Sequence, residues 1–103
     1  MGAFANKMTL VHPGEVLREE FLRPMGRSAH SLSLKLCVSA SRVNALVRER
    51  RGITTDTALR LARFFNTTPQ FWLNLQTSFD LKQTEMEVGD RIKHEIHPMH
   101  AAA

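Results

Sequence analysis

A chain of 103 residues has room for one domain with a modest hydrophobic core. Its composition, 43% hydrophobic and 23% charged, is ordinary for a globular protein, and no apolar run approaches the ~20 residues that cross a bilayer. The single cysteine, Cys37, excludes an internal disulfide framework and favours a reducing compartment. We therefore expect a cytoplasmic protein that makes no membrane contact.

The net charge of +4 is concentrated in one part of the chain. Residues 42–63 contain six arginines and two acids, whereas residues 1–41 contain five Lys/Arg and three acids, and residues 64–103 contain three Lys/Arg and five acids. A local basic patch is expected of a surface that contacts phosphates. A solvated basic face without a partner has the same composition, so charge alone leaves both interpretations open.

Two helices are predicted before residue 37, and each is marked by its first and last residues. Residues 12–24, HPGEVLREEFLRP, place Pro13 near a first turn, an apolar stripe behind it and Pro24 as a stop. Ser28 is then the N-cap candidate of a helix with apolar residues at helical spacing up to Leu36. No segment alternates for long with the two-residue period of a strand.

A third helix is predicted only a few residues later, with Ser39 as its N-cap candidate. It carries Val43, Leu46 and Val47 at i, i+3 and i+4, which is the spacing of a core-facing side. Two helices joined by a turn of three to four residues are the signature of a helix-turn-helix unit, although structural helical hairpins share it.

Two more helices are predicted after the segment RRGITT at residues 50–55. One of the threonines at 54 and 55 caps the fourth helix, and Thr68 caps the fifth, with a proline at its first position. Beyond residue 82, Gly89 and Pro98 interrupt the pattern, which leaves room for at most a short sixth helix. Five short helices with short links predict a compact all-α domain.

A helical wheel of the third helix separates a buried side from an outward side that is small and polar, then cationic. Such a side fits a major groove about 12 Å wide, where asparagine pairs with adenine, arginine with guanine, and alanine contacts the thymine methyl. An ordinary solvated helix has similar residues, but the tight turn before it and the basic run after it favour DNA reading. The predicted base-reading residues are Ala40, Ser41, Arg42, Asn44, Ala45 and Arg48.

Residues at the ends of these helices are predicted to contact phosphates, which orient a protein on DNA without specifying sequence. Arg50 and Arg51 follow the third helix, Ser39 begins it, and Ser28 begins the helix before it.

The fifth helix carries an aromatic and apolar stripe that has two interpretations. Aromatic residues at helical spacing usually form core, but four of them, counting Phe65, are many for a domain of this size. A protein that reads two half-sites about 34 Å apart also needs a two-fold dimer. We therefore predict that part of this stripe is a dimer interface, formed by Phe71, Trp72, Leu75 and Phe79.

The histidines near the C-terminus and the single cysteine are the residues that could indicate an enzyme or a metal site. His94, His97 and His100 lie near Glu95, but Pro98 breaks their helix and nothing completes a tetrahedral metal site. Cys37 lies between apolar neighbours and is predicted to be a buried structural thiol rather than a nucleophile. We therefore predict no enzymatic activity, no metal and no cofactor. A pure protein-interaction module remains an alternative.

Three stretches resemble the HigA-type antitoxins, a branch of the lambda-repressor-like helix-turn-helix proteins. They are HPGEVLREEFLRPMG at 12–26, VSASRVNALV at 38–47, and RRGITTDTALRLARFFNTTPQFWLNLQTSFDL at 50–81. The first and last are specific to this branch, whereas a generic helix-turn-helix protein would share only the middle one. The resemblance implies a helix-turn-helix domain over 12–81 with a dimerising fifth helix, a flexible arm at 1–11 and a C-terminal extension at 82–103.

The resemblance also implies a function. Proteins of this branch form homodimers, repress their own promoter at a palindromic operator of double-stranded DNA, and neutralise a RelE-like endoribonuclease toxin. It places the recognition helix at residues 39–49 and phosphate contacts around Ser28 and Ala29. A stand-alone transcriptional regulator without a toxin is the alternative within the same family.

Two residues depart from the pattern of this branch. Cys37 and Glu49 stand where glycine is frequent, in the turn and after the recognition helix respectively. Gly52 is expected to supply an alternative stop for the recognition helix. Glu49 places a negative charge beside the predicted DNA surface.

Overall fold

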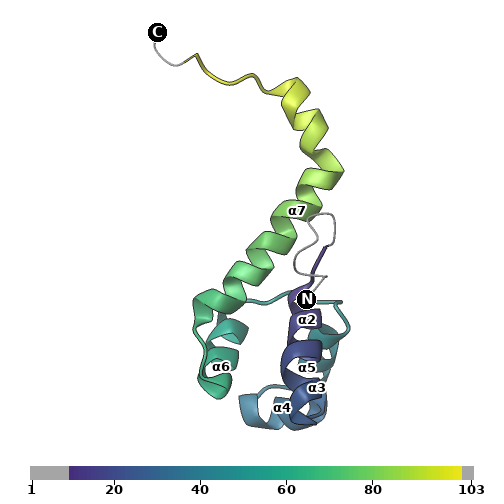
Figure 1. Cartoon of the computed structure of the whole chain (residues 1–103), viewed down its shortest axis with the longest axis vertical. Helices are drawn as coiled ribbons and strands as arrows, with labels where there is room; N and C mark the ends of the chain where they lie inside the picture. The colour runs from purple at the N-terminus through teal and green to yellow at the C-terminus, as the bar shows by residue number, and fades with distance from the viewer. Residues whose placement is uncertain (1–9, 101–103) are drawn as a thin grey trace.

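The computed structural model describes residues 10–100, in which every regular element is helical (Figure 1). The all-α class and the five predicted helices are confirmed, while the arm predicted at 1–11 lies, up to residue 9, outside the described residues. The first helix has three consecutive segments. In chain order the elements are α2 (Pro13–Val16), η1 (Leu17–Leu22), α3 (Arg23–Met25), α4 (Ala29–Leu36), α5 (Ala40–Val47), α6 (Thr55–Phe65) and α7 (Pro69–Glu95).

Pro24 does not end the first helix, contrary to the sequence prediction. A proline inside a helix lacks the backbone donor and crowds the carbonyl four residues before it. Here the turns before Pro24 are widened into π-helix, in which the backbone N–H of Arg23 donates to the carbonyl of Arg18. The chain continues helically to Met25 and stops at Gly26, whose left-handed backbone (φ 62°) closes the helix.

The predicted N-caps are confirmed for the four later helices. In each case the side-chain oxygen accepts a hydrogen bond from the backbone N–H three residues later, which satisfies a donor that the helix itself leaves unpaired. Thr54, and not Thr55, caps α6. The caps are Ser28 for α4, Ser39 for α5, Thr54 for α6 and Thr68 for α7.

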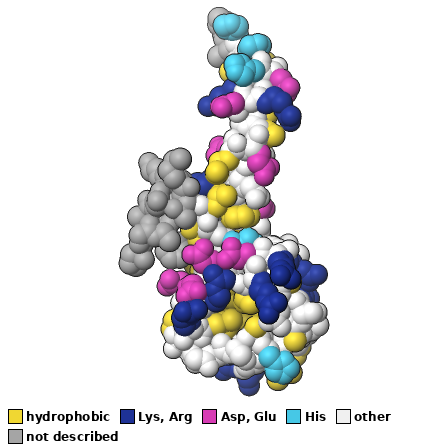
Figure 2. All heavy atoms as spheres, turned by 90° about the vertical axis from the view of Figure 1, so that its right-hand side faces the viewer, with side chains coloured by type: hydrophobic (Ala, Val, Ile, Leu, Met, Phe, Trp, Pro, Cys, Tyr) yellow, Lys and Arg dark blue, Asp and Glu magenta, His cyan; other side chains and the backbone are white. Residues whose placement is uncertain are grey.

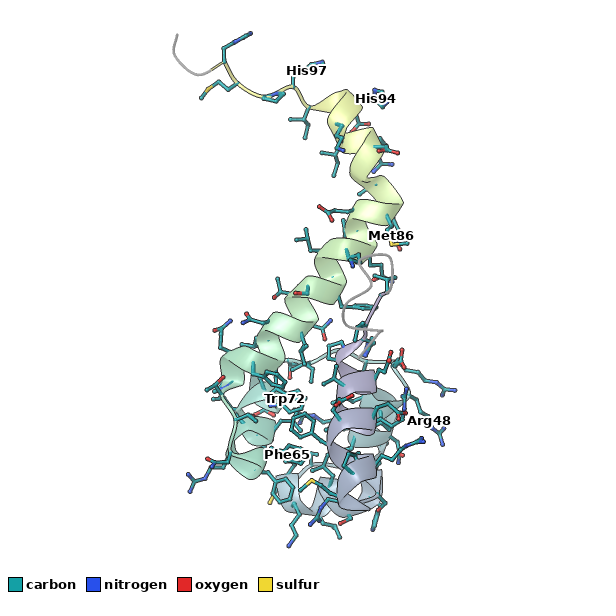
Figure 3. The ribbon with its side chains drawn as sticks, viewed as in Figure 1. Arg48, Phe65, Trp72, Met86, His94 and His97 are labelled. Carbon is teal, nitrogen blue, oxygen red and sulfur yellow. The ribbon has the colours of Figure 1, made fainter. Side chains whose placement is uncertain are left out.

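The core is centred on Trp72, whose side chain is fully buried (Figure 3). The rings of Phe21 and Phe65 lie 5.0 and 6.1 Å from it, centroid to centroid, and its indole N–H donates to the Thr67 hydroxyl at 2.8 Å. The prediction that Trp72 contacts a second subunit is therefore wrong, because no part of this side chain reaches the surface.

α7 is much longer than the sequence predicted, and its second half leaves the globular part of the molecule as one continuous helix that bends toward its end (Figure 1). The helix has 27 residues and no break at Gly89, so residues 82–95 are not a separate element. One interior glycine costs only ~1 kcal/mol relative to alanine, and the strong helix formers Glu85, Met86 and Arg91 lie within four residues of it. Pro98 lies beyond the end of the helix. None of the helices within residues 10–100 is both long and apolar enough to cross a membrane.

The two residues that replace glycine, Cys37 and Glu49, have left-handed backbones with φ of 58° and 62°. Cys37 ends α4, and Glu49 follows Arg48 at the end of α5, so Gly52 is not the stop that was predicted. The backbone path that favours glycine is thus kept without glycine. Cys37 is also exposed, which corrects the prediction of a buried thiol.

Replacing Cys37 by glycine is expected to raise the free energy of unfolding by about 0.5 to 1 kcal/mol. A side chain in the left-handed region costs about 1 to 2 kcal/mol, of which the greater freedom of glycine in the unfolded chain cancels a part. Urea denaturation measures the change. The matched control is Lys35→Gly in the right-handed body of α4, which is expected to lower stability by ~1 kcal/mol. Equal losses in both variants would contradict the prediction.

Candidate nucleic-acid interface

α4 and α5 form the predicted helix-turn-helix unit (Figure 1). Three residues, 37–39, separate them, and the backbone N–H of Val38 donates to the carbonyl of Ser33 at 3.1 Å, which closes the end of α4. The hydroxyl of Ser39 then accepts from the backbone N–H of Arg42 at 3.2 Å and begins α5. The turn is therefore fixed by hydrogen bonds on both sides, and α5 leaves it in one direction.

α5 buries the side that the helical wheel predicts. Val43 and Leu46 are 2% and 3% exposed, and Val47 packs against the same core. On the opposite side Ser41 and Arg48 are exposed, and Arg48 points away from the core (Figure 3). Of the remaining predicted base-reading residues, Ala40, Asn44 and Ala45 are half-buried along the same helix.

Arg42 is the exception among the predicted base readers. Its guanidinium donates to the carboxylate of Asp56 at 2.5 Å and to the hydroxyl of Thr57 at 2.7 Å, both in the first turn of α6. Arg60 donates to the same carboxylate at 2.8 Å. Hydrogen bonds from Arg42 and then Arg60 hold the pKa of Asp56 below its usual value. Arg42 thus ties α5 to α6 in this structure and does not project beside the other predicted readers.

The other arginines near α5 remain available to a partner. Arg48, Arg50 and Arg51 are exposed, and none of them has an ion pair with another residue of the described chain. Figure 2 shows Lys and Arg side chains gathered on the globular part, with acidic side chains beside them. Unpaired guanidinium groups give up no existing partner when they meet a phosphate.

The predicted phosphate contacts at Ser28, Ala29 and Ser39 lie at the starts of α4 and α5. Ser28 is exposed, and its oxygen accepts from the backbone N–H of Ser31 at 3.0 Å, which leaves its hydroxyl proton free to donate. Ala29 is the first residue of α4, where backbone N–H groups point out of the helix. These contacts stay predictions.

Glu49, the acid beside this surface, is held by Arg18 of the first helix. A guanidinium nitrogen of Arg18 lies 3.3 Å from the Glu49 carboxylate, and another donates to the backbone carbonyl of Val47. The negative charge is therefore partly neutralised within the protein, and its presence next to the arginines does not exclude DNA contact there.

Two residues that the sequence interpretation passed over make structural contacts outside the helix-turn-helix unit. His12 is buried and is the N-cap of α2: its Nδ1 accepts from the backbone N–H of Gly14 at 2.8 Å, and its ring lies edge-on to Phe79 at 4.8 Å. Burial lowers the pKa of His12. Gln76 of α7 accepts from the backbone N–H of Ile53 at 2.6 Å. A histidine before proline at a helix start signals the first role, while nothing in the sequence signals the second.

The dimer-interface prediction concerned four residues of α7, of which Trp72 is already excluded. Phe71 is 39% exposed, while Leu75 and Phe79 are half-buried, Phe79 against His12. His94 and His97 lie at the far end of α7 and just beyond it (Figure 3). Among the described residues no three His, Cys, Asp or Glu side chains come together as metal ligands.

Comparison with known proteins places this geometry in a family. The helix-turn-helix family pattern matches residues 17–72. Virulence-associated protein I of Dichelobacter nodosus is 60% identical over 82 residues, which are 80% of this chain and 76% of that protein. Antitoxin HigA-1 of Vibrio cholerae is 35% identical over 83 residues, 81% of this chain and 78% of its own length.

A solved structure is similar in fold as well as in sequence. The Pseudomonas aeruginosa antitoxin HigA, solved with the higBA promoter, superposes with a TM-score of 0.86 and 48% identity. The match covers 87% of this chain and 98% of that one. The similarity thus includes the helix-turn-helix unit and most of α7. The chain belongs to the helix-turn-helix family and, within it, to the HigA-type antitoxins.

Proposed function

We propose that this chain represses its own promoter by binding a palindromic operator, and that it is the antitoxin of a toxin–antitoxin pair. The main support for DNA binding is the outward side of α5. This side has small polar residues and ends at Arg48, which is exposed and unpaired within the described chain. Arg50 and Arg51 follow in the sequence. A relative with 48% sequence identity was solved with promoter DNA, which supports DNA binding by this chain. No step of this function requires catalysis.

On this proposal α5 enters the major groove. The amide of Asn44 bonds the edge of adenine and the guanidinium of Arg48 bonds guanine, each at two points, while the methyl groups of Ala40 and Ala45 face thymine. Arg50 and Arg51 neutralise phosphates beside the groove, with Ser28, Ala29 and Ser39 at the helix starts completing the backbone contacts.

Replacing Arg50 and Arg51 together by alanine is expected to weaken binding to every duplex and to flatten its salt dependence. Each phosphate contact contributes about 0.9 to the slope of log K against log salt, and a dimer would lose two contacts in each subunit, so the slope should fall by about 3.6. Fluorescence anisotropy with the chain's own promoter and a scrambled duplex measures both. Arg23→Ala with Arg91→Ala removes the same charge from exposed positions outside α5 and should leave the slope unchanged. An unchanged slope in the Arg50/Arg51 variant would remove them from the interface.

The proposed operator is palindromic, so the protein should act as a dimer, and α7 is the element that offers a surface for it. Its projecting half carries Leu81, Met86 and Ile92 at 59%, 65% and 42% exposure. Leu81 and Ile92 line one shallow hollow with Gly89. Figure 2 shows apolar side chains along this projecting half of α7. A two-fold pairing of α7 through this hollow would bury Leu81 and Ile92 and set two recognition helices apart on the DNA.

Leu81→Glu with Ile92→Glu is expected to shift the protein from dimer to monomer, because the substitutions place four charges in a paired apolar surface. Sedimentation velocity at micromolar concentration measures the mass. Gln83→Glu with His94→Glu, at exposed positions on the opposite side of the same helix, is the matched control and should leave the dimer intact. A monomeric unmodified chain, or a dimeric variant, would place the interface elsewhere.

The partner toxin is proposed from the antitoxin family, and we expect a small basic endoribonuclease of the RelE-like kind encoded beside this chain. Co-expression of the two, followed by purification on a tag of the antitoxin, should recover a complex and relieve growth arrest by the toxin. Absence of such a neighbouring reading frame would favour a stand-alone regulator. A relative in Escherichia coli, 42% identical over 73 residues, is described only as a transcriptional regulator.

A further inference from the structure

Four carbonyls at the end of α5 have no partner within that helix, and three of them are satisfied by the chain that follows. An α-helix leaves its last four carbonyls unpaired. The backbone N–H groups of Arg48, Glu49 and Arg50 donate to the carbonyls of residues 44, 46 and 45 at 3.0, 3.0 and 2.8 Å. The fourth, that of Val47, accepts instead from the guanidinium of Arg18 at 2.5 Å, from a residue 29 positions away.

The guanidinium of Arg18 is held in one orientation. Its Nε donates to Glu19 at 2.9 Å, and one terminal nitrogen lies 3.3 Å from Glu49, while the other donates to Val47. The hydrogen bond with Glu19 is the largest cause that raises the pKa of Arg18. Each of the three guanidinium nitrogens of Arg18 therefore has its own partner. The single ammonium group of a lysine could not make these three contacts in the same geometry.

A second contact presses the same end of α5 against the first helix. A Cβ atom at Gly14 would lie 1.9 Å from the carbonyl oxygen of Leu46, so this approach requires a residue without a side chain. Two successive carbonyls of α5 thus contact the first helix. The carbonyl of Leu46 packs closely against Gly14, and that of Val47 accepts a hydrogen bond from Arg18. The C-terminal end of α5 is therefore held against the first helix at two successive residues.

We propose that Arg18 is a positioning residue for DNA reading: through the Val47 carbonyl it fixes the tilt at which α5 presents Asn44 and Arg48. Arg48 directly follows Val47, and α5 is only eight residues long, so a small rotation at Val47 displaces the whole reading side. Arg18 itself reads no base. This inference rests on the proposed function, in which α5 enters the major groove.

The test compares affinity for the chain's own promoter duplex with affinity for a scrambled duplex of equal length. Arg18→Gln is expected to lower the ratio of the two affinities about tenfold, because a charged hydrogen bond is lost at the hinge of α5. Arg18→Lys keeps a single donor to Val47 and should lose about threefold. The matched control is Arg23→Gln, which should keep the ratio. Arg23 is 72% exposed, and within residues 10–100 its one ion pair is with Glu19.

Binding to the scrambled duplex, and its salt dependence, distinguish positioning from direct contact. Positioning predicts that both are unchanged in Arg18→Gln, whereas a phosphate contact predicts a fall in affinity for both duplexes and a smaller salt slope. Circular dichroism checks the fold, and the Arg18→Lys result decides the matter if Arg18→Gln does not fold. An unchanged ratio in the folded variants, or an equal loss on both duplexes, overturns the inference. If the unmodified protein does not prefer the promoter at all, the proposed function fails instead.

Discussion

Replacing Asn44 and Arg48 together by alanine is expected to reduce affinity for the promoter duplex about a hundredfold or more, while the helical circular dichroism signal stays the same. Each two-point contact with a base is worth about 1 to 3 kcal/mol, and this variant removes two from each subunit of the dimer, so a hundredfold loss is the lower limit. Arg48 is exposed, and neither side chain has a hydrogen bond to the described part of the protein, so the fold loses little. Fluorescence anisotropy at fixed salt measures the loss.

The choice of Asn44 and Arg48 follows from the structure. An Arg42→Ala substitution would break the contacts with Asp56 and Thr57 and thereby loosen α5 from α6, so lost binding would not identify a base contact. Arg91→Ala, at an exposed arginine of α7, is the matched control for charge and should bind normally. Full affinity in the Asn44/Arg48 variant, or an equal loss on the scrambled duplex, would show that α5 does not read bases.

Trp72→Ala is expected to lower the free energy of unfolding by about 3 to 5 kcal/mol, the usual cost of removing a large aromatic side chain from a core. Domains of this size are stabilised by only about 5 to 15 kcal/mol, so the variant should be largely or wholly unfolded at 37 °C. The side chain is fully buried and packs against rings from the first helix and α6. Urea denaturation followed by circular dichroism measures the change.

Two controls separate this core role from a role in subunit contact. Thr67→Ala removes only the acceptor of the indole N–H and should cost about 1 kcal/mol. Tenfold dilution of Trp72→Ala should leave its helical signal unchanged at low urea, because the lost contacts lie within one subunit. A variant that keeps its full stability but sediments as a monomer would restore Trp72 to the interface.

The helix starts could be read from the sequence because a cap acts within three residues. A serine or threonine satisfies a backbone donor three positions later whatever the rest of the fold does, which is why Ser28, Ser39 and Thr68 were placed correctly. The buried side of α5 was placed correctly for a similar reason, since the periodicity of a helix fixes which residues share a side.

Helix ends and breaks were predicted less well. Pro24 and Gly89 were treated as interruptions, yet the first is absorbed by a widened turn and the second by a long helix of otherwise good formers. Cys37 and Glu49 adopt the left-handed conformation at the ends of α4 and α5. From the sequence, Gly52 was instead expected to stop the recognition helix. The interior glycine and each left-handed side chain cost about 1 to 2 kcal/mol, and the interior proline costs about 3 kcal/mol. Packing elsewhere outweighs these costs.

Local chemistry along the chain was thus enough to define five helices, the helix-turn-helix unit and the outward side of α5. Contacts between distant segments decided which side chains face outward and which are held inside the protein. Arg42 bonds Asp56, 14 residues away, and Arg18 bonds the carbonyl of Val47, 29 residues away. Whether an arginine meets a neighbour or points outward, and whether an aromatic side chain is core or surface, depends on which segments pack beside it. The periodicity of a helix orients its own residues and carries no information about those neighbours.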